Sequence, residues 1–190
     1  MTTSAHLPPY PILHTARLRL EPVDDCHFDG LRRLNSRPEV MRYISGRPET
    51  AEETAAIIAR VKAAWRSFGY SWWAFVDRAS GELIGAGCIQ HLARDPANPL
   101  EIGWRLLPSM WGQGYASEAA RAMAGFAFEV LAVPTLLAVC DQDNLASARV
   151  MQRLGMGYRG IERWYDIDTT VYAMARDQWQ PGVPEAGARP

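Results

Sequence analysis

The chain has 190 residues, of which 48% are hydrophobic and 22% are charged, a composition that suits one globular domain with a sizeable core. Its 20 basic and 21 acidic residues give a formal net charge of -1, which argues against a strongly basic nucleic-acid surface. No apolar run approaches the ~20 residues that a membrane span needs. We therefore expect neither nucleic acid nor a membrane as a partner.

Three cysteines lie far apart in the sequence, at Cys26, Cys88 and Cys140. Their odd number and wide spacing match neither a disulfide framework nor a metal-ligand motif. The N-terminus also lacks a basic start followed by an apolar run, which is the pattern of a secretory signal. These features predict a cytoplasmic protein with free thiols and no bound metal.

The elements of the first half follow from periodicity and capping residues. Residues 17–23 alternate polar and apolar side chains, as a half-buried strand does. Asp24 or Asp25 is placed to cap a helix, Pro38 suits the first turn of a short helix, and residues 50–53 form a capping box for a longer one. Three strands are then expected over residues 71–76, 82–91 and 100–107, the first two as a hairpin.

The second half is expected to contain two helices and three strands. In chain order these are a helix after a glycine turn at residues 112–114, a buried strand over residues 135–140, a helix from Asn144 to just before Gly155, and a hairpin over residues 156–164 and 169–175. Polar, proline-containing ends predict a flexible N-terminal arm over residues 1–14 and a flexible C-terminal tail over residues 179–190. The folded domain is expected over residues 15–178.

The turn that follows the third strand has the features of an anion-binding site. Gly112 and Gly114 let the backbone turn sharply and approach a ligand without a Cβ in the way. The first N–H groups of the next helix have no acceptor within it and face outward at the positive end of its dipole. A Walker loop would need Lys and Ser or Thr where Tyr115 and Ala116 stand, and a dinucleotide fingerprint would need a third glycine at Ser117. Both motifs are excluded, and a phosphate or pyrophosphate remains the expected ligand.

The loop Trp111-Gly112-Gln113-Gly114-Tyr115-Ala116-Ser117 resembles the coenzyme A loop of the GNAT N-acetyltransferase superfamily, Q/R-x-x-G-x-G/A, with Trp111 where Gln or Arg is usual. Its W-G-x-G-Y-A form is similar to the branch that contains the ribosomal-protein N-terminal acetyltransferases. With the order of elements, the resemblance implies a single-domain α/β (α+β) fold whose central sheet is mixed and largely antiparallel, with helices on both faces. It also implies acetyl-CoA as co-substrate, bound by this loop and, like a missing strand, by the backbone of Trp104, Arg105 and Leu106.

A second motif, from Asn144 to Met156, resembles the family helix N-x-x-[AS]-x-x-[LV]-Y-x-x-x-G-[FM]. The resemblance implies that Asn144 and Ser147 face the pantetheine arm, although a helix cap also explains Asn144 and a solvated first turn also explains Ser147. Met151 stands where many relatives have a tyrosine that protonates the departing thiolate. Because methionine cannot donate a proton, Ser147 is the candidate for this step, or the thiol, with a pKa of ~8.5, leaves unaided.

The acceptor amine must lose a proton, because an alkyl amine with a pKa near ~10 is mostly protonated at neutral pH. Glu101 is the candidate base, since a glutamate on this strand often serves as base in the superfamily. A structural hydrogen bond is its alternative role, and His91 and Asp141 rank below it. Further candidates are Arg121, Arg149 and Arg153 for the nucleotide phosphate, and Trp65, Trp72, Trp73 and Trp164 for either an acceptor pocket or the core.

Two functions compete on this reading. An enzyme would move an acetyl group from acetyl-CoA to a primary amine, on a protein N-terminus or a small molecule, by direct attack in a ternary complex. The alternative is a coenzyme-binding regulatory or interaction module without catalysis. Met151 in place of tyrosine favours this alternative, whereas the presence of Glu101 and Ser147 argues against it. The sequence leaves the acceptor and the assembly open, with a homodimer among the options.

Overall fold

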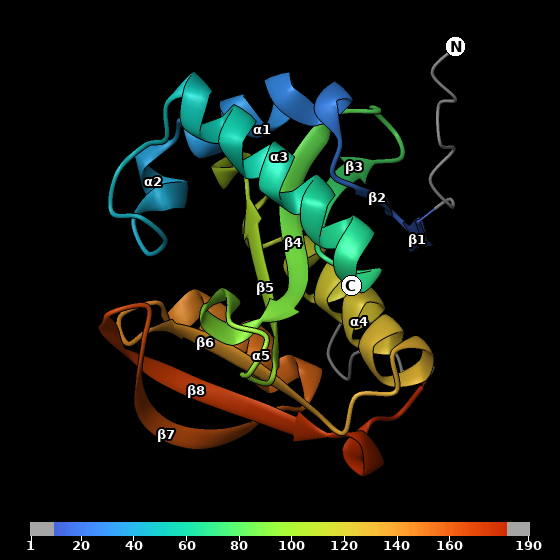
Figure 1. Cartoon of the computed structure of the whole chain (residues 1–190), viewed down its shortest axis with the longest axis vertical. Helices are drawn as coiled ribbons and strands as arrows, with labels where there is room; N and C mark the ends of the chain where they lie inside the picture. Colours follow the sequence, from blue (N-terminus) through green and yellow to red (C-terminus); the bar gives the residue numbers. More distant parts are fainter. Residues whose placement is uncertain (1–9, 182–190) are drawn as a thin grey trace.

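Eight strands form one mixed sheet in the computed structural model, which describes residues 10–181 (Figure 1). The strands are β1 (Leu13–His14), β2 (Leu18–Pro22), β3 (Trp72–Asp77), β4 (Leu83–His91), β5 (Leu100–Leu106), β6 (Thr135–Asp141), β7 (Gly157–Trp164) and β8 (Ile167–Ala175). Their order across the sheet is β1-β2-β3-β4-β5-β6-β8-β7. All neighbours are antiparallel except β5 and β6, which run parallel. This is the mixed, largely antiparallel sheet that the sequence predicts.

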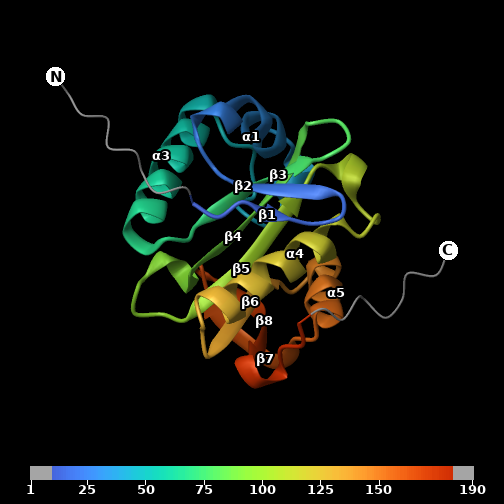
Figure 2. The ribbon, with the colours of Figure 1, turned by 90° about the vertical axis from the view of Figure 1, so that its right-hand side faces the viewer.

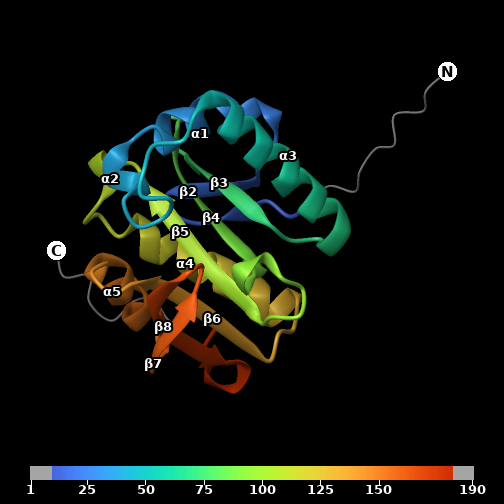
Figure 3. The ribbon, with the colours of Figure 1, turned by 60° about the vertical axis from the view of Figure 1, so that its left-hand side comes forward.

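Helices cover both faces of the sheet. They are α1 (Phe28–Asn35), α2 (Pro38–Met41), α3 (Ala51–Phe68), α4 (Tyr115–Gly125), which continues as a π-helix over Phe126–Val130, and α5 (Leu145–Leu154). Figures 2 and 3 show α1 and α3 on one side of β3 and β4, and α4 on the other. A Cβ at Gly87 of β4 would meet Met123 of α4, whereas one at Gly30 of α1 would meet Leu83 at the start of β4. None of the helices within residues 10–181 combines the length and hydrophobicity of a bilayer crossing.

The capping signals position these helices largely as expected. Thr50 accepts a hydrogen bond from the backbone N–H of Glu53, whose side chain accepts one from the N–H of Thr50, so α3 begins with the predicted box. Gly155 adopts φ 92° where α5 ends, a conformation that glycine takes at little cost. Asp24 caps a short 3₁₀ turn, Asp25–His27, that precedes α1, rather than α1 itself.

Parts of both predicted flexible ends pack against the domain. Residues 1–9 of the arm and residues 182–190 of the tail lie outside the described residues. Within residues 10–14, Tyr10 packs on Trp65 and β1 pairs with β2. Trp179 packs on Phe128 at 5.6 Å between ring centroids. The apolar aromatic surface that Tyr10 and Trp179 bury explains why these short segments are held, although their sequence has no periodic pattern.

Candidate active site

Strands β5 and β6 separate almost as soon as they meet. They pair at one position, Glu101 with Leu137, and the rest of β5, from Ile102 to Leu106, is paired with β4 only. Because β5 and β6 are parallel, their carboxyl ends share one edge of the sheet, and α4 and α5 follow them there in contact with each other (Figure 2). The gap beyond Glu101 therefore exposes one edge of β5 to a strand-like ligand, beside two helix N-termini.

The loop before α4 has an anion-binding conformation. Gly112 and Gly114 adopt φ 73° and 82°, in the left-handed region that favours glycine. The first hydrogen bond of the helix runs from the N–H of Glu118 to the carbonyl of Gly114 at 3.0 Å. The preceding N–H groups, those of Tyr115, Ala116 and Ser117, therefore have no acceptor within the helix. The Ser117 hydroxyl is buried and has no hydrogen-bond partner among residues 10–181, so these residues fit a pyrophosphate group.

Side chains from the loop and from outside it fix this conformation. The indole of Trp111 donates to the carbonyl of Leu106 at 2.9 Å, so this carbonyl of β5 is already engaged. Arg17, next to β2, donates to the carbonyl of Gln113 at 2.9 Å and pairs with Glu118 at 2.7 Å. Its guanidinium also lies 4.1 Å from the ring centroid of Tyr115. Sequence reasoning missed Arg17, because the alternation of β2 marks it only as an outward-facing strand residue.

The start of α5 confirms one of the two roles considered for Asn144. Its side-chain oxygen accepts a hydrogen bond from the backbone N–H of Ser147 at 3.2 Å, which is a helix cap. Ser147 is half-buried in the first turn. Met151 is 2% exposed and packs in the core, so its thioether has a packing role. Contact of Asn144 and Ser147 with the coenzyme stays a prediction.

Glu101 lies in a buried hydrogen-bond network. Its carboxylate accepts from the amide of Gln90 at 2.8 Å and from the hydroxyl of Tyr165. The Tyr165 hydroxyl accepts in turn from the backbone N–H of Ala93 at 3.0 Å, and the indole of Trp72 donates to the side-chain oxygen of Gln90 at 2.9 Å. Burial raises the pKa of Glu101, although the two side-chain hydrogen bonds and the charge of Arg94 partly offset this. A carboxyl with a raised pKa is suited to accept a proton near neutral pH.

Sequence reasoning missed the partners of Glu101. Gln90 is opposite Glu101 in the β4–β5 register, which a strand prediction without register does not give. Tyr165 occupies the β7–β8 turn with φ 54°, and 64 positions separate it from Glu101. The only signal for Tyr165 in the sequence was that a tyrosine followed by an aspartate stands at the turn of the last predicted hairpin.

A cavity of about 290 Å³ adjoins this network. It lies between α3 and the ends of β3 and β4, and its wall includes Trp72 and Gln90. Arg60 and Arg94 also line it. His91 borders it, but its two ring nitrogens are occupied by Tyr70 at 3.0 Å and the carbonyl of Asn98 at 2.8 Å. The cavity is therefore a candidate acceptor pocket, whose wall reaches Glu101 through its hydrogen-bond partner Gln90.

The remaining candidates divide between structural and unassigned roles. Trp65 and Trp73 are core residues, Trp164 hydrogen-bonds Glu162 in the hairpin, and Trp72 alone of the four lines the cavity. Asp141 accepts from the N–H of Asp143 at 2.8 Å, as a turn former does. Arg121 donates to the carbonyl of Gln180 and stacks on Trp179, so the C-terminal segment already occupies this guanidinium. Arg149 and Arg153 are exposed on α5.

The two cysteines on the elements of this site are held as thiols. Cys88 lies opposite Gly103 in the β4–β5 pair, and complete burial raises its pKa well above the ordinary value. Burial and the charge of Asp141 raise the pKa of Cys140 to about 11. Neither has the lowered pKa that activates a cysteine nucleophile. The described residues also contain no cluster of three or more side chains able to hold a metal ion.

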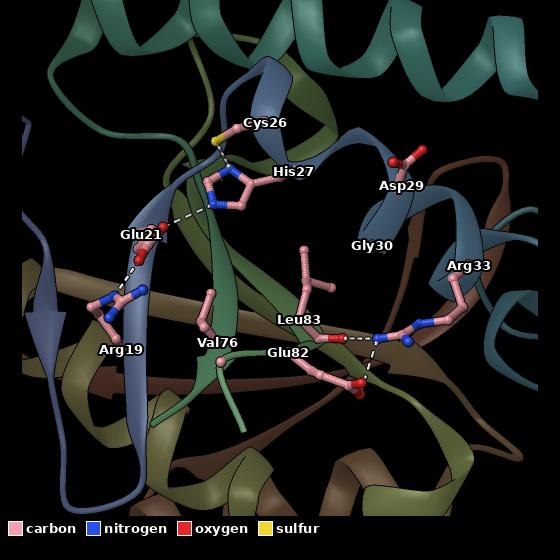
Figure 4. Close-up of a pocket in the computed structure, with 11 residues that line it drawn as sticks. Arg19, Glu21, Cys26, His27, Asp29, Gly30, Arg33, Val76, Glu82 and Leu83 are labelled. Atoms are coloured by element: carbon pink, nitrogen blue, oxygen red, sulfur yellow. Dashed lines mark hydrogen bonds and ion pairs between the residues drawn. The ribbon is translucent and has the colours of Figure 1, made fainter. Parts of the chain in front are cut away.

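A larger cavity, of about 470 Å³, lies at the other end of the β3–β4 hairpin (Figure 4). Most of its charged groups are paired with one another, Glu21 with Arg19 and His27, and Arg33 with Glu82 at 3.5 Å, whereas Asp29 has no ion-pair partner among residues 10–181. These pairs leave no cation without a partner, and neither Gln90 nor Tyr165, the hydrogen-bond partners of Glu101, lines the cavity. Its size alone therefore does not make it the functional site.

Comparison with known proteins decides the family. Residues 17–157, about three quarters of the chain, match the model of the acetyltransferase (GNAT) domain. The chain belongs to the GNAT acetyltransferase family. It is an N-acetyltransferase, in agreement with the names of its relatives.

Relatives of this GNAT enzyme share most of its length. It is 32% identical to the FsC-acetyl coenzyme A-N(2)-transacetylase of Aspergillus fumigatus, over 89% of this chain and 78% of that protein. It is 29% identical to the N-acetyltransferase YoaA of Bacillus subtilis, over 88% of this chain and 98% of the relative. The crystal structure of an acetyltransferase from Agrobacterium tumefaciens, 29% identical, covers 91% of this chain and 99% of its own, with a TM-score of 0.76. A ribosomal-protein alanine acetyltransferase from Vibrio fischeri, 16% identical, shares the fold at a TM-score of 0.75 over 90% of this chain and all of its own.

Proposed function

We propose that the protein transfers the acetyl group of acetyl-CoA directly to a primary amine, on a small molecule or a protein N-terminus, with Glu101 as general base. The observation that carries the proposal is the buried carboxylate of Glu101 at the point where β5 and β6 separate. In this proposal the base lies between the predicted coenzyme groove and the cavity lined by Trp72 and by Gln90, its hydrogen-bond partner. The name of the Aspergillus relative, which specifies acetyl coenzyme A and a nitrogen acceptor, supports the same reaction.

The coenzyme would bind across two elements. Its pyrophosphate would accept hydrogen bonds from the first N–H groups of α4 and from the Ser117 hydroxyl, with residues 111–117 around it. Its pantetheine amides would pair with the open edge of β5 at Trp104, Arg105 and Leu106, opposite the N-terminus of α5. The Leu106 carbonyl already accepts a hydrogen bond from Trp111, so a pantetheine amide would donate to its second lone pair.

The transfer needs one proton acceptor and one leaving group. The amine nitrogen forms a bond to the thioester carbonyl carbon, the carbon–sulfur bond breaks, and Glu101 accepts the amine proton directly or through water. The sulfur leaves as thiolate and takes a proton from Ser147 or from solvent, because Met151 has none to donate. The raised pKa values of Cys88 and Cys140 argue against a first transfer of acetyl to the protein.

Release of free coenzyme thiol distinguishes the enzyme from a coenzyme-binding module. Purified protein with acetyl-CoA and a panel of primary amines, including amino acids, amino sugars and short peptides, should release thiol well above the rate of solvent hydrolysis. Mass spectrometry should find the acetyl group on nitrogen of the acceptor. A protein that binds acetyl-CoA in calorimetry, but releases no thiol with any amine, would be the non-catalytic module.

A further inference from the structure

The cavity beside Glu101 is lined by positive charge and by no carboxylate. Arg60 of α3 and Arg94 of the β4–β5 connection both line it. Arg105 of β5 lies under the same wall, with its guanidinium 4.6 Å from the ring centroid of Trp72. No carboxylate in residues 10–181 forms an ion pair with any of the three.

Arg60 and Arg94 are exposed, as unpaired arginines often are, but Arg105 differs in its surroundings. The Nε of Arg105 is buried and has no hydrogen-bond partner among the described residues, which is costly for a charged group. Burial lowers the pKa of Arg105, and burial together with the charge of Arg94 lowers that of Arg60, while the charge of Glu49 only partly offsets both effects. Mutually repelling guanidinium groups around a cavity are stabilised by a bound anion. In the larger cavity of Figure 4, by contrast, Arg19 and Arg33 each form an ion pair with a glutamate.

Resting on the proposed function, we infer that the acceptor is a small amine that also carries an anionic oxygen group, a carboxylate or a phosphate, which Arg60, Arg94 and Arg105 receive while the amine faces Glu101. Arginine is suited to this task because its planar fork binds carboxylate and phosphate oxygens in pairs. A volume of about 290 Å³ lies at the lower end for small-molecule sites, so the cavity fits a small acceptor better than a folded partner.

The test uses acceptor pairs that differ in one anionic group. The carboxylate arm compares leucine with leucinamide and glycine with glycinamide, and the phosphate arm compares phosphoethanolamine with ethanolamine. In each pair the charged member has the more basic amine, so intrinsic reactivity at fixed pH favours the neutral one. We expect the charged member of a pair in at least one arm to have a kcat/KM at least tenfold higher than its neutral counterpart. The arm in which this preference occurs shows whether the anion is a carboxylate or a phosphate.

Arginine variants connect this preference to the cavity. Arg60→Gln and Arg94→Gln should each reduce the charged-over-neutral preference about tenfold and leave the KM for acetyl-CoA unchanged. Arg66→Gln is the matched control, because Arg66 is an exposed arginine of α3 outside the cavity lining and its loss should not alter the preference. If Arg94 instead serves only to keep Glu101 ionised, Arg94→Gln will slow both members of a pair equally and move the acidic limb of the rate profile to higher pH.

The outcomes separate this inference from the proposed function. Acetylation of neutral amines as fast as their charged counterparts, or a preference that survives both arginine variants, overturns the inference and leaves the acetyltransferase proposal standing. Coenzyme binding without thiol release for any amine in the panel contradicts the proposed function, and the inference falls with it.

Discussion

Gln90 donates a 2.8 Å hydrogen bond from its amide to the carboxylate of Glu101, across the β4–β5 pair, and this carboxylate is only 6% exposed. Burial of a carboxyl raises its pKa above the unfolded value, so the folded state favours the protonated form. The stabilising contribution of the protonated form is fully present below the unfolded pKa and is lost as pH rises through the folded pKa.

Glu101→Gln should therefore be more stable than the wild type at neutral pH, since the amide keeps the shape and avoids the buried charge. The melting temperature of the variant minus that of the wild type should grow as pH rises from about 4 to about 8. Thermal unfolding across this range measures it. Glu162→Gln, at an exposed position of β7, is the control and should show no such pH-dependent gain. A difference that stays constant with pH would mean that Glu101 is not a desolvated titrating group.

Tyr165→Phe removes a hydrogen bond that lowers the pKa of Glu101. The pKa of Glu101 should rise further, and the acidic limb of the rate profile should move to higher pH. Over the pH range of this limb the rate should fall, since less of the base is ionised there. Tyr158→Phe changes an exposed tyrosine of β7 and should leave the profile unchanged. An unshifted limb in Tyr165→Phe would show that the hydrogen bond does not act on the base.

Met151 should tolerate exchange without loss of chemistry, because it packs in the core and donates no proton. Met151→Leu should keep the rate of thiol release within about twofold. Met151→Tyr should leave the rate unchanged or raise it modestly, while the added volume destabilises the fold by about 1–3 kcal/mol, which for a domain of this size is about 2–12 °C in melting temperature. A tenfold slower rate in a folded variant that binds acetyl-CoA would give Met151 a catalytic role.

Substitutions at Gly114 test the predicted coenzyme loop through a charge difference. Asn and Asp have similar shapes and both tolerate left-handed backbone, so Gly114→Asn and Gly114→Asp share the cost of φ 82°. The aspartate should weaken acetyl-CoA binding at least about tenfold more than the asparagine, because its charge repels the pyrophosphate. Gly46→Asp, at φ 72° with no atom within 4 Å of an added Cβ, controls for the backbone cost alone. Calorimetry showing equal affinities for the Asn and Asp variants would contradict the placement of the pyrophosphate.

The fold was largely predictable because its signals are local. The capping box at Thr50, the glycine at position 155 and the alternation of residues 17–23 act within a few positions of the chain. The same holds for the glycines of the predicted coenzyme loop, whose conformation follows from residues 112–114. The predicted succession of strands and helices is confirmed for this reason, with β1 and the π-helical end of α4 as additions.

The site was only half predictable because its chemistry depends on register and on distant contacts. Glu101 could be chosen from its strand, but its burial and its bonds to Gln90 and Tyr165 depend on how β4, β5 and the last hairpin come together. Arg17, 96 positions earlier in the sequence, donates to the carbonyl of Gln113 in the predicted coenzyme loop. Pairing between residues so far apart in sequence cannot be deduced from periodicity.

The central claim is that Glu101 accepts the proton of the attacking amine, and the pH profile of Glu101→Gln tests it most directly. The measurement is thiol release from acetyl-CoA with an acceptor whose pKa is low enough to be neutral throughout, so that amine protonation adds no limb of its own. We expect the variant to be slower by about 10² to 10⁴, to bind acetyl-CoA as the wild type does, and to lose the acidic limb, which in the wild type should lie above the ordinary pKa of glutamate. Near wild-type turnover with the same acidic limb would contradict the claim and leave Glu101 as a structural carboxyl.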